Sequence, residues 1–149
     1  MSCAQPFLRA VVAVLAVVIL ALGCRAKNPA APGGTLTGTW SGAVVDPVSG
    51  TGTMTLTMIQ TGAGVGGTWS TSLESNPSMK GGSAGGSTAG SLASLFLTPT
   101  TSIVCESGMT LSGTLNVTAT LAGNRLTGTY LVLTCNSATS GTIDLTRQG

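Results

Sequence analysis

The sequence predicts an all-β domain, a small eight-stranded antiparallel up-and-down barrel, and three observations support this. From about residue 36 onward, apolar and polar residues alternate in short runs such as Thr114–Leu121, which is typical of strands with one buried face. Turn residues separate the runs at hairpin spacing, as in Asp46–Gly50 and Thr61–Gly64. After residue 24 no helical pattern of adequate length occurs. Because short turns dominate over long crossovers, we favour a closed meander barrel; a two-sheet β-sandwich is the alternative.

The first 24 residues have the pattern of an export leader. One cation, Arg9, precedes an unbroken apolar run over residues 10–22, which is too short to span a bilayer as a helix and is typical of a signal peptide. The run ends in Leu20-Ala21-Leu22-Gly23-Cys24, which resembles the bacterial lipobox, where cleavage leaves a lipidated N-terminal cysteine. This resemblance implies lipid on Cys24. The alternative is an ordinary signal peptide cut nearby, with Cys24 incidental or removed.

A linker without periodicity follows the cysteine. Residues 25–34 contain two prolines, so we expect a tether between anchor and domain. The chain therefore divides into a lipoprotein signal peptide (1–23), a lipidated cysteine with a flexible linker (24–34) and a β-barrel domain (35–149). Arg25 stands where enterobacterial lipoproteins carry an inner-membrane retention Asp. By that resemblance we expect a secreted protein held by its lipid in the bacterial cell envelope, at the outer membrane if the organism has one.

Strong compositional bias marks the rest of the chain. Of the 126 residues from Cys24 onward, 60 are Thr, Gly or Ser, a bias that also occurs in disordered chains. Period-two alternation favours strands instead, because β-branched Thr suits a pleated surface facing water while the alternate residues build a core. The Gly-rich tract 81–90 could equally be a flexible loop. In chain order, the expected strands are 36–45, 52–60, 65–73, 81–90, 92–98, 109–121, 125–135 and 141–147.

A short repeat opens several of these strands, with a glycine two residues before a large side chain. It occurs in Leu36–Ser41, Val65–Ser70, Leu111–Leu115 and Leu126–Tyr130. Residues two apart share a face of a strand, so each copy points a large side chain inward beside a glycine that makes room for it or lets the strand bend. The irregular spacing of the copies favours one closed barrel over a solenoid.

Two of these copies resemble known barrels. Leu36–Trp40 followed by Val65–Trp69 resembles the opening of avidin-type barrels, and Gly38–Trp40 resembles the G-x-W of lipocalins. In lipocalins an Arg of the last strand packs across that Trp, which implies this role for Arg147. The later tryptophans of avidin-type biotin sites have no counterpart here, so biotin binding is not implied. The whole chain more closely resembles uncharacterised bacterial Gly/Thr-rich lipoproteins, a likeness that implies no function.

The four cysteines reduce to one pair. Cys3 leaves with the leader and Cys24 would carry lipid, so Cys105 and Cys135 remain in an oxidising compartment. We predict a disulfide between them that closes a loop of about 30 residues. Two thiols without any His make a poor zinc site, so we expect neither a metal nor a cofactor.

Composition also limits the function. The formal net charge is only +2 and no basic stripe occurs, so nucleic-acid binding is not expected. The chain has no His, and its four carboxylates share no sequence relation that indicates a common site, so we expect a protein that is not an enzyme.

Two functions from different classes remain. In the first, the barrel binds a small apolar ligand, because inward glycines leave room and Trp40, Trp69, Tyr130 and Arg147 could form a barrel floor or line the ligand. The alternative is a purely structural role, in which these aromatics plug a barrel end. In the same interpretation, Met54, Met58 and Met109 fill the core. In the second, the domain is a protein-interaction module, protease-inhibitor-like or a structural surface lipoprotein, that meets an exported protein through the loops 74–80 and 99–108.

Overall fold

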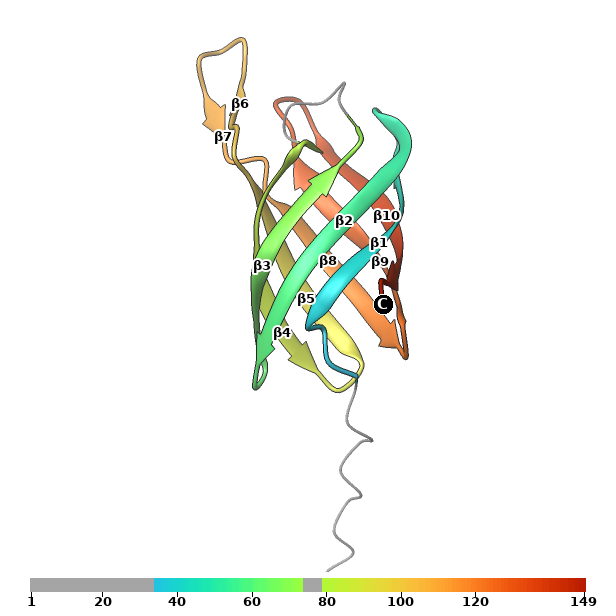
Figure 1. Ribbon diagram of the computed structural model, residues 1–149. Helices are drawn as coiled ribbons and strands as arrows, with labels where there is room; N and C mark the ends of the chain where they lie inside the picture. The colour runs from blue at the N-terminus through green and yellow to red at the C-terminus, as the bar shows by residue number, and fades with distance from the viewer. Residues whose placement is uncertain (1–33, 74–78) are drawn as a thin grey trace, which may run out of the picture. The chain divides into compact units, whose positions relative to one another are not determined.

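The alternating segments pair with their neighbours and close into an eight-stranded antiparallel barrel (Figure 1). The computed structural model describes residues 34–73 and 79–149, and the order around the barrel is β1-β10-β9-β8-β5-β4-β3-β2. The barrel strands are β1 (Gly38–Asp46), β2 (Gly50–Thr61), β3 (Gly64–Thr71), β4 (Gly81–Ala89), β5 (Leu92–Pro99), β8 (Leu115–Ala122), β9 (Arg125–Leu133) and β10 (Ala138–Arg147). The predicted meander is confirmed, including a strand for the Gly-rich tract, and the sandwich alternative is not formed.

Some predictions fall outside this description. The signal peptide, Cys24 and the linker up to residue 33 precede the described residues, and the predicted loop 74–80 is described only from Met79. Lipidation of Cys24 therefore stays a prediction. Within the described residues, no helix has the length and apolar character needed to cross a bilayer.

Side chains alternate between core and solvent as the sequence predicts. Along β8 the burial pattern is strictly alternating, with Val117 and Ala119 inside and Thr118 and Thr120 outside. The interior is thus apolar, and outward-facing hydroxyls cover much of the wall. Closure of the sheet pairs every barrel strand on both sides, so that no barrel edge has a row of unpaired backbone groups. The largest fully buried side chains are Trp40, Tyr130, Leu36, Met54, Leu56, Met58, Met79, Leu97, Leu115, Leu126, Leu145 and Val44.

Inward-facing glycines mark places where neighbouring strands come very close. A Cβ added at Gly67 would overlap the carbonyl oxygen of Thr57 on β2, and one at Gly128 would overlap that of Thr118 on β8. The backbone of the next strand therefore occupies the space that a side chain would need. These glycines act as bends that let the sheet coil into a narrow barrel, rather than as gaps in its filling.

The predicted strand 109–121 is wrong in its first part. Gly113 adopts a left-handed conformation with φ of 64°, which ends regular pairing and separates β7 (Thr110–Leu111) from β8. β7 pairs instead with β6 (Ile103–Val104), inside the segment that was expected to be a loop. The two form a hairpin arm, residues 100–114, which stands out from the barrel (Figure 1). Met109, an expected core residue, lies on this arm and is 51% exposed.

Two adjacent glycines of β3 test the role of the inward positions. We expect Gly67→Ala to lower the free energy of unfolding by about 1–3 kcal/mol, because the new methyl group collides with the β2 backbone. Gly66→Ala is the matched control, since its Cβ would have no neighbour within 4 Å and its backbone is not left-handed. Urea denaturation measures both. Equal effects of the two substitutions would contradict the assignment of Gly67 as a bend.

Candidate functional site

One end of the barrel is closed by the segment that leads into it. We call this the tether end, because the described chain begins here at Gly34, beside the β8–β9 turn. Leu36 is fully buried, and its N–H donates to Oε1 of Gln60 at 2.8 Å. The Trp40 indole N–H donates in turn to the Leu36 carbonyl at 2.9 Å. The incoming chain is thereby fixed across the barrel mouth.

The last strand completes this closure. The Arg147 guanidinium carbon lies 4.6 Å from the centroid of the Trp40 ring, so the stacking implied by the lipocalin resemblance is present. Arg147 also donates to the Thr35 carbonyl, while its Nε is buried without a hydrogen-bond partner among the described residues. A cation over a Trp ring is worth about 0.5–2 kcal/mol, depending on its desolvation. Trp40 and Arg147 thus act together as an end plug.

The opposite end, which we call the loop end, contains a buried acid. Asp46, the last residue of β1, is only 3% exposed. Its Oδ1 accepts hydrogen bonds from the Val48 and Ser49 backbone N–H groups at 3.0 and 2.6 Å, which shapes the β1–β2 turn. Its Oδ2 accepts one from the Tyr130 hydroxyl at 2.6 Å. Gly141 makes this possible, since a Cβ there would overlap the Tyr130 hydroxyl.

Burial and hydrogen bonding act in opposite directions on Asp46. Burial raises the pKa of the carboxyl, but the donors from Tyr130, Ser49 and Val48 together outweigh it and leave the pKa below its usual value. The pKa of Tyr130 is raised, first by burial and then by its hydrogen bond to Asp46. The pair therefore remains a carboxylate accepting from a neutral phenol across the neutral pH range.

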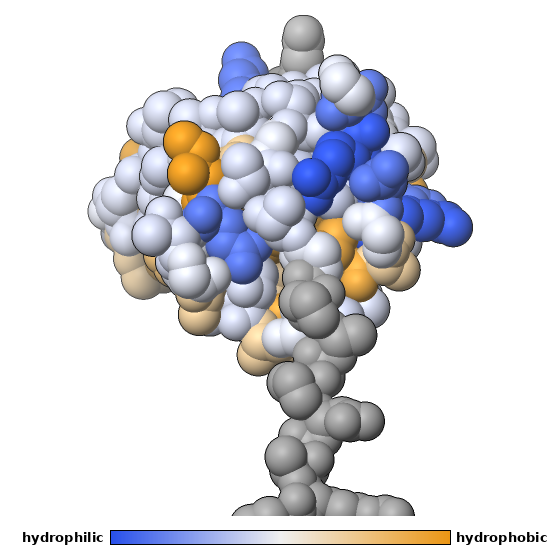
Figure 2. All heavy atoms as spheres, turned by 60° about the horizontal axis from the view of Figure 1, so that its bottom comes forward, coloured by the Kyte–Doolittle hydropathy of each residue, from blue (hydrophilic) through white to orange (hydrophobic). Residues whose placement is uncertain are grey.

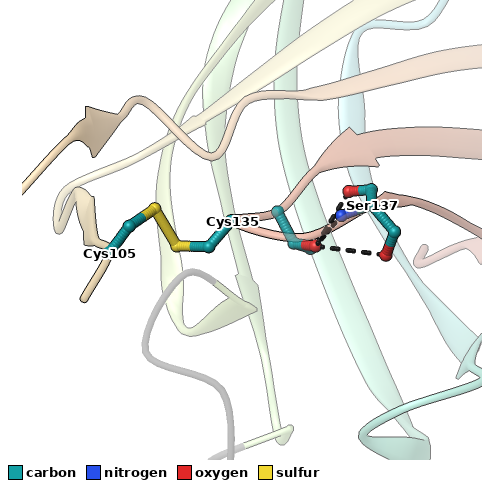
Figure 3. Close-up of a disulfide and its surroundings, with 4 residues drawn as sticks. Cys105, Cys135 and Ser137 are labelled. Atoms are coloured by element: carbon teal, nitrogen blue, oxygen red, sulfur yellow. Dashed lines mark hydrogen bonds between the residues drawn. A yellow bond between two sulfur atoms is a disulfide. The ribbon is translucent and has the colours of Figure 1, made fainter. Parts of the chain in front are cut away.

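The loop end also carries the hairpin arm, and a disulfide fixes the arm to the barrel (Figure 3). Cys105 and Cys135 are bonded with a Cα–Cα distance of 5.5 Å, as predicted from the cysteine count. On the arm, the Cys105 N–H donates to the Met109 carbonyl at 2.9 Å. On the barrel side, hydrogen bonds between Thr134 and Ser137 hold the β9–β10 turn.

Apolar side chains of the arm remain in contact with solvent. Val104 is 73% exposed and Met109 51%. A pocket of about 480 Å³ lies between the arm and the β9–β10 turn, with Glu106 and Asn136 among its polar residues and the two cysteines in its wall. The loop end therefore offers apolar and polar groups together on a segment that is covalently held in place.

The residues proposed from the sequence as a shared aromatic floor are divided between these regions. Trp40 and Arg147 close the tether end, whereas Tyr130 is hydrogen-bonded to Asp46 at the other end of β1. Trp69 faces inward on β3, one strand beyond Leu56, the β2 residue that pairs with Trp40. Its indole N–H is 3.4 Å from the Thr98 carbonyl.

Sequence reasoning missed two features of the loop end. Asp46 was assigned to a turn, but its partner Tyr130 lies 84 residues away, so no local pattern could indicate the pair. The arm was missed because each of its strands has only two paired residues, too few for period-two alternation to show. The one available signal was the predicted disulfide, which required residues near 105 to lie beside residues near 135.

Comparison with protein-family models, curated proteins and solved structures finds no match to this chain. The resemblance to avidin-type and lipocalin barrels is carried by short sequence motifs alone.

Removal of the disulfide should destabilise the domain measurably. For the double variant Cys105→Ser, Cys135→Ser we expect a loss of about 3–4 kcal/mol, because the cross-link closes a 30-residue loop and restricts the unfolded chain. Thermal unfolding of the oxidised wild type and the variant measures the difference. A reductant should lower the melting temperature of the wild type and leave the variant unchanged; identical melting curves for wild type with and without reductant would contradict the prediction.

The Asp46–Tyr130 pair should make stability depend on pH. Because the folded-state pKa of Asp46 lies below its unfolded value of about 3.9, the stabilisation is present above that pH and is lost as pH falls through the folded pKa. Tyr130→Phe removes one donor from the buried carboxylate, so we expect a loss of about 1–3 kcal/mol at pH 7. The difference from wild type should shrink as the pH falls through the lowered folded-state pKa of Asp46, because the carboxyl is then protonated. Urea titrations across this range test it, and a difference independent of pH would exclude the assigned hydrogen bond as its cause.

Proposed function

We propose that the chain is an exported, lipid-anchored barrel that acts as a non-catalytic protein-interaction module. In this proposal the barrel is a rigid support, the tether end faces the bacterial membrane and the loop end presents the arm to another exported protein. The observation that carries the proposal is the arm itself, with exposed Val104 and Met109 on a hairpin that the Cys105–Cys135 disulfide holds to the barrel.

The state of the arm supports a role in binding. Large apolar side chains that protrude into water contribute nothing to the core, and exposed apolar groups ringed by polar ones are typical of interaction sites. The disulfide limits the conformations of the arm before a partner arrives, so less entropy is lost on association. A short, pre-ordered, partly apolar loop of this kind fits the protease-inhibitor-like or structural surface lipoprotein expected as one alternative from the sequence.

The two ends of the domain also support the orientation. The chain enters at the tether end through Gly34, next to the β8–β9 turn, whereas the arm leaves β5 and returns to β8 at the loop end (Figure 1). A lipid on Cys24 would therefore hold the tether end near the membrane and leave the arm pointing away from it.

Binding of a small apolar ligand inside the barrel has less support from the same geometry. The expectation depended on inward glycines leaving free volume, but at Gly42, Gly67, Gly82 and Gly128 the neighbouring backbone takes that volume. A pocket of about 890 Å³ lies on the outer wall of the barrel, next to Ile59 and Phe96.

The test is native mass spectrometry of the protein solubilised from membranes of its own host. We expect a second polypeptide that stays bound to the wild type and is lost from the double variant Val104→Asp, Met109→Asp. Val48→Asp is the matched control, because Val48 is 79% exposed at the same end but lies on the β1–β2 turn outside the arm. Each variant is first checked for an unchanged melting temperature.

The outcomes separate the functions. Loss of the partner with the arm variant alone supports the interaction module. A retained small apolar molecule on a barrel without a bound polypeptide would overturn it in favour of the ligand-binding function. Cys24→Ser should move the protein from the membrane to the soluble fraction, and continued membrane association of this variant would overturn the lipid anchor.

A further inference from the structure

Charged residues are unevenly distributed around the barrel wall. The four adjacent strands β2, β3, β4 and β5 contain no Asp, Glu, Lys or Arg, and neither does β8. The exposed charges of the wall lie on β9 and β10, where Arg125 and Asp144 form an ion pair of 2.5 Å and Arg147 closes the tether end. We call the outward faces of β2–β5 the neutral wall. Because this wall consists largely of Thr, Ser and Gly, no charged side chain has to lose its hydration when the wall contacts an apolar phase.

The lower part of the neutral wall, next to the tether end, is apolar. Ile59 near the end of β2, Leu92 at the start of β5 and Phe96 further along β5 are 68%, 56% and 51% exposed. Ile59 and Phe96 occupy one outward row across the sheet, separated by Gly66 and Gly85. The Phe96 ring covers Gly85, while nothing covers Gly66.

This row forms a shallow groove on the outside of the barrel. Its volume is about 890 Å³, its floor is made by glycines of β3 and β4, and its sides include Ile59 and Phe96. The hydroxyls of Thr61, Ser87 and Ser94 line its edge. An apolar groove bordered by uncharged hydrogen-bonding groups matches the chemistry of the boundary between acyl chains and headgroups of a lipid bilayer.

The groove lies at the end where a lipid anchor would act. The β2–β3 and β4–β5 turns that flank it are at the tether end, where Gln60 also hydrogen-bonds to Leu36 and Thr37 of the incoming chain. Figure 2 shows this end, with a mostly pale surface and the largest group of strongly hydrophilic atoms on one side. Only ten residues, 24–33, separate the predicted lipid from Gly34, so even a fully extended tether reaches no further than about 35 Å.

We infer that the barrel lies with the lower neutral wall against the membrane, with Ile59, Leu92 and Phe96 entering the headgroup–acyl boundary and the groove receiving lipid. This inference rests on the proposed lipid anchor, which supplies the high local concentration that so small an apolar surface needs. The contact fixes the orientation of the barrel, since the charged β9–β10 wall then faces water. The arm lies at the loop end, remote from the tether, because it connects the loop-end termini of β5 and β8.

Tryptophan quenching by brominated lipids tests the contact. The full lipidated chain carrying Phe96→Trp is reconstituted into vesicles of phosphatidylcholine and phosphatidylglycerol with brominated acyl chains. Leu131→Trp is the matched control, because Leu131 is also outward-facing and 46% exposed but lies on β9. Trp40 and Trp69 are 0% and 3% exposed and give the same background in both variants.

We expect quenching of the introduced indole to be roughly twofold or more stronger in Phe96→Trp than in Leu131→Trp, and to persist in high salt because the wall is uncharged. Equal quenching, or none, in vesicle-bound protein would overturn the membrane contact while leaving the anchor intact. A Phe96→Trp protein shielded from brominated lipid and found as a dimer by cross-linking would overturn it in favour of a second copy on the groove. Failure of the lipidated protein to sediment with vesicles would instead overturn the proposed anchor.

Discussion

The structure depends on the pairing of β1 with β10, which closes the barrel. The six paired positions from Trp40↔Arg147 to Val45↔Thr142 join the beginning of the domain to its end. Without this pairing the two strands would be exposed edges, with unpaired backbone groups and an apolar face open to water. Closure removes both problems at once. It also creates the end plug, because it brings the Arg147 guanidinium over the Trp40 ring.

Closure at small diameter places a steric demand on the wall. Strands that coil tightly approach each other so closely on the inside that only glycine fits at Gly42, Gly67, Gly82 and Gly128. The glycine content of the chain is therefore partly a consequence of barrel geometry. Large side chains two residues away, such as Trp69 after Gly67, fill the space that each bend leaves.

Core packing is provided by uncharged residues, and the few charged groups of the barrel lie at its ends or on one side of its wall. Asp46 is held inside the loop end by Tyr130 and the β1–β2 turn, and Arg125 pairs with Asp144 on the outer wall. The β2–β5 side carries none. The domain is thus divided into a neutral side and a charged side, and into a plugged end and an end with a disulfide-linked arm. These differences are the physical basis of both proposals, an orientation at the membrane and a contact site that faces away from it.

The sequence alone determined the features that depend on the local pattern of residues, and it also determined the disulfide, which follows from counting the cysteines that remain after export. Period-two alternation identified most of the barrel strands and their inward faces, but it left the Gly-rich strand β4 open against a loop and extended β8 too far toward its start. Turn residues placed the hairpins, and the cysteine count identified the Cys105–Cys135 bond. It also indicated Arg147 over Trp40 through a short family-like motif. Tertiary structure decided what distant segments do to each other. The Asp46–Tyr130 hydrogen bond, the close approach at Gly67, the exposure of Met109 and the groove beside Phe96 were decided by the folded structure. Turn residues predict which strands are neighbours, but a local pattern carries no information about the register and distance at which atoms of different strands meet.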